Sequence, residues 1–212
     1  MKLLLAVVVL GTILLGGSAH VFRMGSCKKF TAVQNFDPQK FNGTWYVIKK
    51  LATSSPCMRM TVITSPSNEL TVEETRTPSV SQMLPVDTSV KIIGELTMDP
   101  NDKGNMKLKW KGNFMNSLYS TNFAILDTNY TTYALDIECQ SVKGFSFIRR
   151  DSATIYSRTP TLAQDVIDML EAQLVQYDID VKRMSPIEQG NCKNPGDNDY
   201  NFVLSDKGVT QE

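Results

Sequence analysis

The feature that most restricts the fold is a series of short strand-like segments that ends in a single helical segment. The clearest strand is 106–111, in which Met106, Leu108 and Trp110 alternate with three lysines. A period of two places the apolar side chains on one face and the lysines on the other, as in a half-buried strand. The expected strands, separated by turn-forming residues, are 43–50, 57–63, 70–74, 86–98, 106–111, 120–126, 131–139 and 144–156.

After residue 160 the pattern changes to helical spacing. Thr161 is expected to cap a helix, with Gln164 completing a capping box, and the helix is expected to continue to about Tyr177. The apolar residues at helical spacing are Val166, Ile167, Leu170, Leu174 and Val175. A short extended segment is expected at 179–181.

One helix after about eight successive strands discriminates between fold classes. A parallel α/β sheet would alternate helices with strands, and an immunoglobulin sandwich needs no terminal amphipathic helix. The sequence therefore predicts an all-β fold, an eight-stranded antiparallel up-and-down barrel with one C-terminal α-helix packed outside. A barrel of this size can hold one small ligand.

The first residues predict a leader. Lys2 precedes an apolar run at 3–15, and small residues follow up to Ala19. This pattern favours a secretory signal peptide over a membrane anchor, because the run is short for a hydrocarbon core of about 30 Å. The expected organisation is a signal peptide at 1–19, one barrel domain at 20–192 and a polar, mobile tail at 193–212. We expect a secreted, extracellular protein without a transmembrane segment.

Charge and cysteine content exclude some partners and predict covalent links. Lys and Arg total 22, as do Asp and Glu, so electrostatics indicate no affinity for nucleic acid or an anionic membrane. Cys27, Cys57, Cys139 and Cys192 predict two disulfides in an oxidising compartment, and three pairings are possible. No pair has the CxxC spacing of many zinc and redox sites.

Three short motifs, in chain order, resemble those of the lipocalin family. They are Gly43-Thr-Trp45 at the first strand, Asp127-Thr-Asn-Tyr130 before the seventh strand, and Arg158 after the last strand.

A longer C-terminal run extends this resemblance. Residues 179–192 are similar to the same region of the apolipoproteins D and the insect bilin-binding proteins, and the resemblance covers roughly 27–192. It implies disulfides Cys27–Cys139 and Cys57–Cys192. It also implies a barrel closed at one end by the indole of Trp45 under the guanidinium of Arg158, an arrangement that suits a planar cation. These motif residues are expected to hold the fold rather than to contact a ligand.

The expected cavity is lined by side chains that alternate towards the barrel interior. The candidates are Val47, Met60, Val62, Val90, Ile92, Met106, Leu108, Trp110, Phe123, Ile125, Tyr133, Leu135, Phe145 and Phe147. Such an apolar surface suits a lipid, fatty acid, sterol, retinoid or bilin-type pigment, although the same residues could simply fill a dry core. Loops at 75–84, 87–89 and 113–118 are expected to control entry.

Catalysis is not expected. His20 is the only histidine and lies at the start of the mature chain, so no Ser-His-Asp set and no histidine-held haem is predicted inside the barrel. The cysteines are assigned to disulfides, and nothing in the sequence pairs two carboxylates for acid–base chemistry. We therefore expect no catalytic residue, no cofactor and no metal.

Two functions remain open at this stage. The first is extracellular binding and transport of a small hydrophobic ligand. The alternative is a secreted protein-interaction module, a protease inhibitor or receptor ligand, that uses loops such as 75–84 on a cell-surface receptor or other protein partner. Asn42 and Asn129 lie in glycosylation sequons.

Overall fold

The computed structural model describes residues 21–53, 55–77, 89–111, 119–142, 145–190, 192, 202–205 and 208–210. The expected signal peptide, His20 and most of the expected entry loops lie outside the described residues. Of those loops, residues 75–77 and Ser89 are described.

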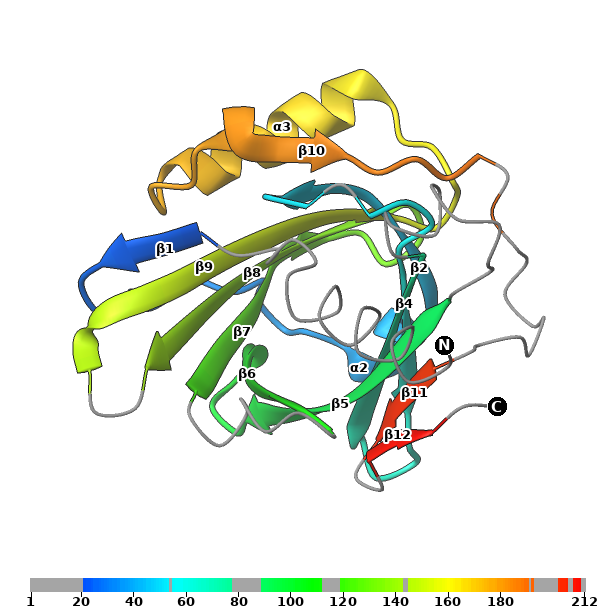
Figure 1. The fold of residues 1–212 in the computed structure, drawn as a ribbon, viewed down its shortest axis with the longest axis horizontal. Coiled ribbons are helices and arrows are strands. Elements are labelled where there is room, and N and C mark those ends of the chain that lie inside the picture. The colour runs from blue at the N-terminus through cyan, green and yellow to red at the C-terminus, as the bar shows by residue number, and fades with distance from the viewer. Residues whose placement is uncertain are drawn as a thin grey trace, which may run out of the picture.

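Eight antiparallel strands close into a barrel, which confirms the predicted fold class (Figure 1). Each strand pairs with the next along the chain, and β9 returns to pair with β2. The strands are β2 (Gly43–Leu51), β3 (Arg59–Thr64), β4 (Leu70–Arg76), β5 (Val90–Asp99), β6 (Asp102–Trp110), β7 (Tyr119–Thr128), β8 (Tyr133–Val142) and β9 (Phe145–Ser157).

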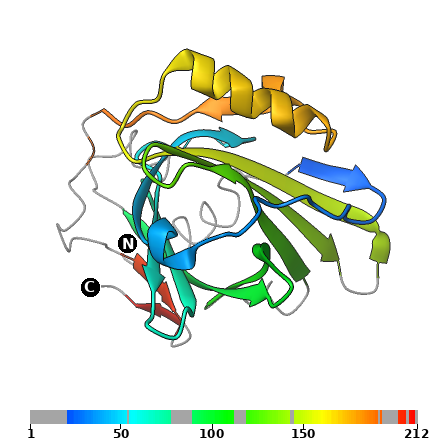
Figure 2. The ribbon, with the colours of Figure 1, turned by 180° about the vertical axis from the view of Figure 1, so that it is seen from behind.

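The remaining short elements attach to the barrel. β1 (Val21–Met24) pairs with β9, and β10 (Met184–Pro186) pairs with β2. The short helix α2 (Pro38–Phe41), capped by Asp37, lies at the end of the barrel that faces the reader in Figure 2.

The expected tail contains two strands that the sequence did not predict. β11 (Phe202–Ser205) pairs in parallel with β5, and β12 (Gly208–Thr210) pairs with β11.

Helix α3 (Gln164–Val175) packs outside the barrel across β8 and β9 (Figure 1). Its buried residues Ile167, Leu170 and Leu174 share one face at helical spacing. They belong to an outer apolar cluster together with Leu135 and Ile155. The outer faces of two barrel strands are therefore buried rather than solvated.

The predicted helix cap at Thr161 is wrong. The helix begins at Gln164 after Ala163, which makes no side-chain cap bond. The carbonyl of Thr161 instead accepts hydrogen bonds from the hydroxyls of Ser157 (3.0 Å) and Thr159 (2.8 Å). Thr161 therefore belongs to the connection between β9 and α3.

The extended segment expected at 179–181 is also displaced. Asp180 caps a 3₁₀ turn at Val181–Arg183, because its carboxylate accepts from the backbone N–H of Lys182. The strand begins at Met184, five residues after the expected start at Ile179, as β10.

Two disulfides fasten the terminal segments to the barrel. Cys27 bonds to Cys139 on β8, and Cys57 bonds to Cys192, with Cα–Cα distances of 5.7 and 5.5 Å. This is the pairing that the family resemblance implies.

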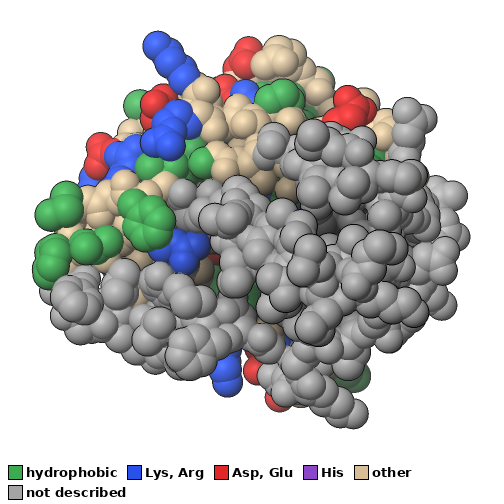
Figure 3. Space-filling view, in the orientation of Figure 1, with side chains coloured by type: hydrophobic (Ala, Val, Ile, Leu, Met, Phe, Trp, Pro, Cys, Tyr) green, Lys and Arg blue, Asp and Glu red, His purple; other side chains and the backbone are tan. Residues whose placement is uncertain are grey.

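One part of the outer surface is apolar. In Figure 3, exposed hydrophobic side chains gather on the side of the molecule where β1 lies against β9. Among the side chains of these two strands that the structure describes, Phe22, Met24 and Phe147 are the large hydrophobic ones that are exposed, at 60%, 75% and 52%.

Candidate functional site

The base of the barrel is sealed by Trp45. Its indole is completely buried at the start of β2 and donates a hydrogen bond to the carbonyl of Phe41, at 3.0 Å. The guanidinium carbon of Arg158 lies 3.5 Å from the centre of the Trp45 ring, which is a stacked cation–π contact. The motif residues therefore form a plug.

Arg158 is held over this plug by backbone carbonyls. Its guanidinium donates to Asn42 (2.9 Å), Thr44 (3.0 Å) and Tyr130 (3.0 Å). Gly43 has a φ of +101°, and a Cβ atom there would lie 3.3 Å from a guanidinium nitrogen of Arg158. Glycine at this position therefore permits both the backbone turn and the close approach of the arginine.

The second motif builds the turn beside the plug. The side-chain oxygen of Asn129 accepts N–H bonds from Thr131, Thr132 and Tyr133 at 2.8–3.2 Å. The second oxygen of Asp127 accepts from Gln173 of α3 at 2.6 Å. Asn129 and Asn42 are both exposed, and glycosylation at either stays a prediction.

Above the plug, most of the barrel interior is apolar. The interior cluster includes Trp45 and seven of the residues expected to line the cavity, and an eighth, Trp110, packs against it. These are Val47, Met60, Val62, Met106, Leu108, Trp110, Phe123 and Ile125.

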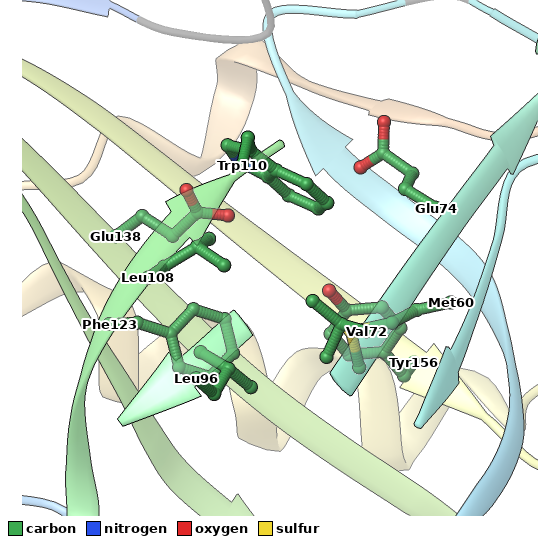
Figure 4. A pocket seen from close by; sticks show the side chains of 9 residues that line it. All are labelled: Met60, Val72, Glu74, Leu96, Leu108, Trp110, Phe123, Glu138 and Tyr156. Carbon is green, nitrogen blue, oxygen red and sulfur yellow. The ribbon is translucent and has the colours of Figure 1, made fainter. Parts of the chain in front are cut away.

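A cavity with an empty volume of about 270 Å³, including space open to solvent, lies over these apolar residues (Figure 4). Its lining residues are Met60, Val72, Glu74, Leu96, Leu108, Trp110, Phe123, Glu138 and Tyr156.

Gly94 helps to shape this cavity. It pairs with Trp110 across β5 and β6, and a Cβ atom at Gly94 would lie 2.8 Å from the indole of Trp110. Glycine therefore lets the indole lie against the backbone of β5 as part of the cavity wall.

The upper half of the interior carries charged groups. Lys50 on β2 is 4% exposed, and its ammonium lies 3.0 Å from the carboxylate of Glu74 on β4. On β8, Asp136 is completely buried and accepts a 2.6 Å hydrogen bond from the hydroxyl of Tyr156. Glu138 is 5% exposed, lines the cavity and makes no hydrogen bond with the described residues. We call Lys50, Glu74, Asp136 and Glu138 the polar belt.

A bulge in β2 brings Lys50 to this position. The register of β2 against β9 shifts between Val47 and Lys49. Lys49 therefore points outward, where it pairs with Glu171 of α3, and Lys50 points inward.

Burial and mutual repulsion set the charge states of the belt. Desolvation, with Asp136 and Glu74 nearby, raises the pKa of Glu138 to about 8 against the pull of Lys50. Desolvation likewise raises the pKa of Asp136 to about 6. Desolvation also opposes the charge of Glu74, but Lys50 and Arg76 outweigh it and lower the pKa of Glu74 below its ordinary value. Near neutral pH the belt therefore holds one ion pair and one carboxyl, Glu138, that retains its proton.

The described ranges contain neither a membrane-spanning helix nor a cluster of metal ligands. No helix in this part of the chain is long and apolar enough to cross a membrane. Among the same residues, no group of three or more His, Cys, Asp or Glu side chains is placed to hold a metal ion.

Apolipoprotein D of Macaca fascicularis is 31% identical to this chain over 174 residues, which cover 81% of the chain and 86% of the relative. The chain belongs to the lipocalin family. Retinol-binding protein 4 of Gallus gallus is 24% identical over 83% of the chain and 91% of its own length. No protein-family model matches the chain.

Solved structures show the same fold. Insecticyanin from the tobacco hornworm Manduca sexta has a TM-score of 0.64 and 18% identity, and the match covers 81% of this chain and 90% of that one. The sequence resemblance to lipocalins is thereby confirmed by independent sequence and structure comparisons.

In this lipocalin two further candidates lie towards the open end. Val90 is buried at the start of β5, and Ile92 is half-buried and pairs with Glu74. By alternation along β5 both share the inward face of Leu96.

Three candidates on β8 and β9 were assigned to the wrong face. Leu135 lies in the outer cluster under α3, and Tyr133 packs against that cluster. Phe147 is 52% exposed on β9. For Leu135 and Tyr133 the assumption that apolar side chains point inward fails because α3 covers this part of the outer face. Phe147 is outside that cluster, and its side chain is exposed rather than covered. Phe145 is part of β9, but its side chain lies outside the described residues.

The sequence reasoning missed Val72, Leu96 and Tyr156, and it missed the polar belt altogether. One signal was present in the sequence. In the segment 134–140 the residues at even positions after Ala134 are Asp136, Glu138 and Gln140, alternating with Leu135, Ile137 and Cys139. If the predicted helix had been placed against the apolar face of this strand, the acidic face would have been predicted to lie inside the barrel.

Proposed function

We propose that this lipocalin is a secreted carrier that binds a small hydrophobic molecule in the barrel cavity. The observation that carries the proposal is the cavity above the Trp45 plug. Its walls include Met60, Leu108, Trp110 and Phe123, so a ligand would lose apolar surface to a largely apolar lining. Such burial is worth about 25 cal/mol per Å² before the entropic costs of binding.

Secretion is part of this proposal. The apolar segment that precedes Ala19 has the composition of a signal peptide. The four cysteines form two bonds, Cys27–Cys139 and Cys57–Cys192, which persist in oxidising compartments. Lipid, fatty acid, sterol, retinoid and bilin-type pigment are the ligand classes to test first.

Trp110 provides the test. Titration of the mature protein with oleic acid, cholesterol, retinol and biliverdin should quench its fluorescence with at least one of them. Trp110→Phe removes this reporter and leaves Trp45, which is completely buried in the plug, as the internal control. If no compound in the panel changes the fluorescence or raises the melting temperature, the carrier function is wrong.

The alternative, a protein-interaction module, depends on loops at the open end. Most of the segment 75–84 lies outside the described residues, so that alternative gains no support from the structure.

A further inference from the structure

Two carboxyls of the polar belt line the cavity, and Glu138 is the one without an ion-pair partner at salt-bridge distance among the described residues. Asp136 also has one buried oxygen without a hydrogen-bond partner there, but it does not line the cavity. The ammonium of Lys50 is paired with Glu74, and Asp136 accepts from Tyr156. Glu138 is 5% exposed, lines the cavity and makes no hydrogen bond with the described residues. Burial of a polar group without a partner costs free energy. A ligand group that forms a hydrogen bond or ion pair with this carboxyl would recover part of that free energy.

The charges around Glu138 favour a cation over an anion. Asp136 and Glu74 both act on Glu138 and disfavour a further negative charge. Lys50 acts on Glu138 more strongly than either of these carboxyls and in the opposite sense, but its ammonium is already held by Glu74. Arg150 at the open end is the weakest influence, and its guanidinium lies over the ring of Phe22. A ligand carboxylate in this cavity would therefore meet two carboxyl groups of the belt, Glu74 and Glu138.

The rest of the cavity fits the apolar part of such a ligand. Glu138 pairs with Phe123 across β7 and β8, and Leu96 pairs with Leu108 across β5 and β6. These apolar side chains continue from the belt towards the base, and Figure 4 shows Glu138 and Trp110 lining the same hollow. The indole face of Trp110 can also attract a cation.

We propose that the cavity selects hydrophobic molecules that carry one amine, with the amine bound to Glu138 and the hydrocarbon directed towards the Trp45 plug. The proposal rests on the carrier function and narrows it to alkylamines and arylalkylamines small enough for the cavity.

Proton balance gives a distinctive signature. At neutral pH the amine enters as an ammonium ion, while Glu138 holds its proton because burial raises its pKa to about 8. Formation of the ion pair requires an ionised Glu138, so the carboxyl proton passes to solvent as the ligand binds. Binding should therefore release a fraction of a proton at pH 7 and should weaken as the pH falls.

The test compares octylamine, octanol and octanoic acid, which share a hydrocarbon chain and differ in the polar end. Isothermal titration at pH 7, in two buffers of different ionisation enthalpy, gives both the affinity and the number of protons released. Octylamine should bind at least about tenfold more tightly than octanoic acid, the usual worth of a charge-assisted hydrogen bond.

Glu138→Gln removes the charge and keeps the shape of the side chain. It should weaken octylamine binding by about tenfold and abolish proton release, while octanol binding stays unchanged and shows that the cavity is intact. Glu95→Gln is the matched control, because Glu95 is exposed and pairs with Lys111. That variant should bind all three compounds like the unmodified protein.

The outcomes separate the two proposals. If octanol and octanoic acid bind as tightly as octylamine, or if Glu138→Gln leaves octylamine affinity unchanged, amine selection is wrong and the carrier function stands. If none of the three compounds binds and the fluorescence panel is also negative, both proposals are wrong.

Discussion

The two ends of the barrel interior use polar groups in opposite ways. At the base, the guanidinium of Arg158 donates to several backbone carbonyls and stacks on Trp45. In the upper half, the carboxyl of Glu138 faces a cavity and has no hydrogen bond with the described residues. The base therefore has no capacity left for a ligand, whereas the belt does. Satisfied buried groups help to specify the fold, whereas the carboxyl beside the cavity is the group to which we assign ligand binding in the proposal above.

The two tryptophans give the largest expected contrast between these ends. Trp45→Ala should lower the free energy of unfolding by about 3–5 kcal/mol, because it empties a completely buried site and removes the partner of Arg158. Trp110→Ala should cost less than half as much, since its side chain is only half-buried beside a cavity that already exists. Urea denaturation of both variants measures the difference. Equal losses would show that the base is no more tightly built than the upper half.

The Lys50–Glu74 pair tests whether the belt is desolvated. Lys50→Met should cost about 3 kcal/mol at pH 8, because it leaves a buried carboxylate without its cation. The penalty should shrink at pH 4, where Glu74 can protonate. A Lys50→Met and Glu74→Met double variant is the control, and it should recover most of the lost stability. A single-variant loss below about 1 kcal/mol would mean that water screens this pair.

Strand alternation predicted the barrel because most of its strands bury one face. On β6, Met106, Leu108 and Trp110 face inward and lysines face solvent, so the apolar face is the inner face. The number and order of the strands followed from this regularity and from the turns between them.

β8 shows where this reasoning stops. Both of its faces are buried, with Leu135 and Ile137 under α3 and Asp136 and Glu138 inside the barrel. Hydrophobicity alone then assigns the apolar face to the interior, and every side chain of the strand moves to the wrong side. The belt was missed for this reason, since its acidic members on β8 looked like solvent-facing residues.

The position of Lys50 was unpredictable for a different reason. It depends on a one-residue shift of β2 against β9 between Val47 and Lys49, and a bulge of this kind leaves no reliable mark in a single sequence. Likewise, the pairing of β11 with β5 is a contact between segments far apart in the chain, which local patterns do not reveal.

The smallest expected effect is a pH dependence that belongs to the upper half alone. Glu138, with a pKa raised to about 8 by burial, holds its proton more tightly in the folded than in the unfolded chain. Its contribution to stability is complete below its ordinary pKa of 4.5 and is lost as the pH rises through about 8. Asp136 acts in the same direction up to about pH 6. Glu74, with a lowered pKa, contributes in the opposite sense only at pH values below its ordinary 4.5.

The free energy of unfolding should therefore fall between pH 5 and pH 8, by an amount on the order of 1–2 kcal/mol. Glu138→Gln should flatten this decline, because glutamine does not titrate, while Glu95→Gln on the outer surface should retain it. Urea midpoints at four pH values across the window measure the slopes. The same slope in both variants would show that Glu138 ionises as readily in the folded protein as in the unfolded chain. The polar groups of the upper half would then be as well satisfied as those at the base.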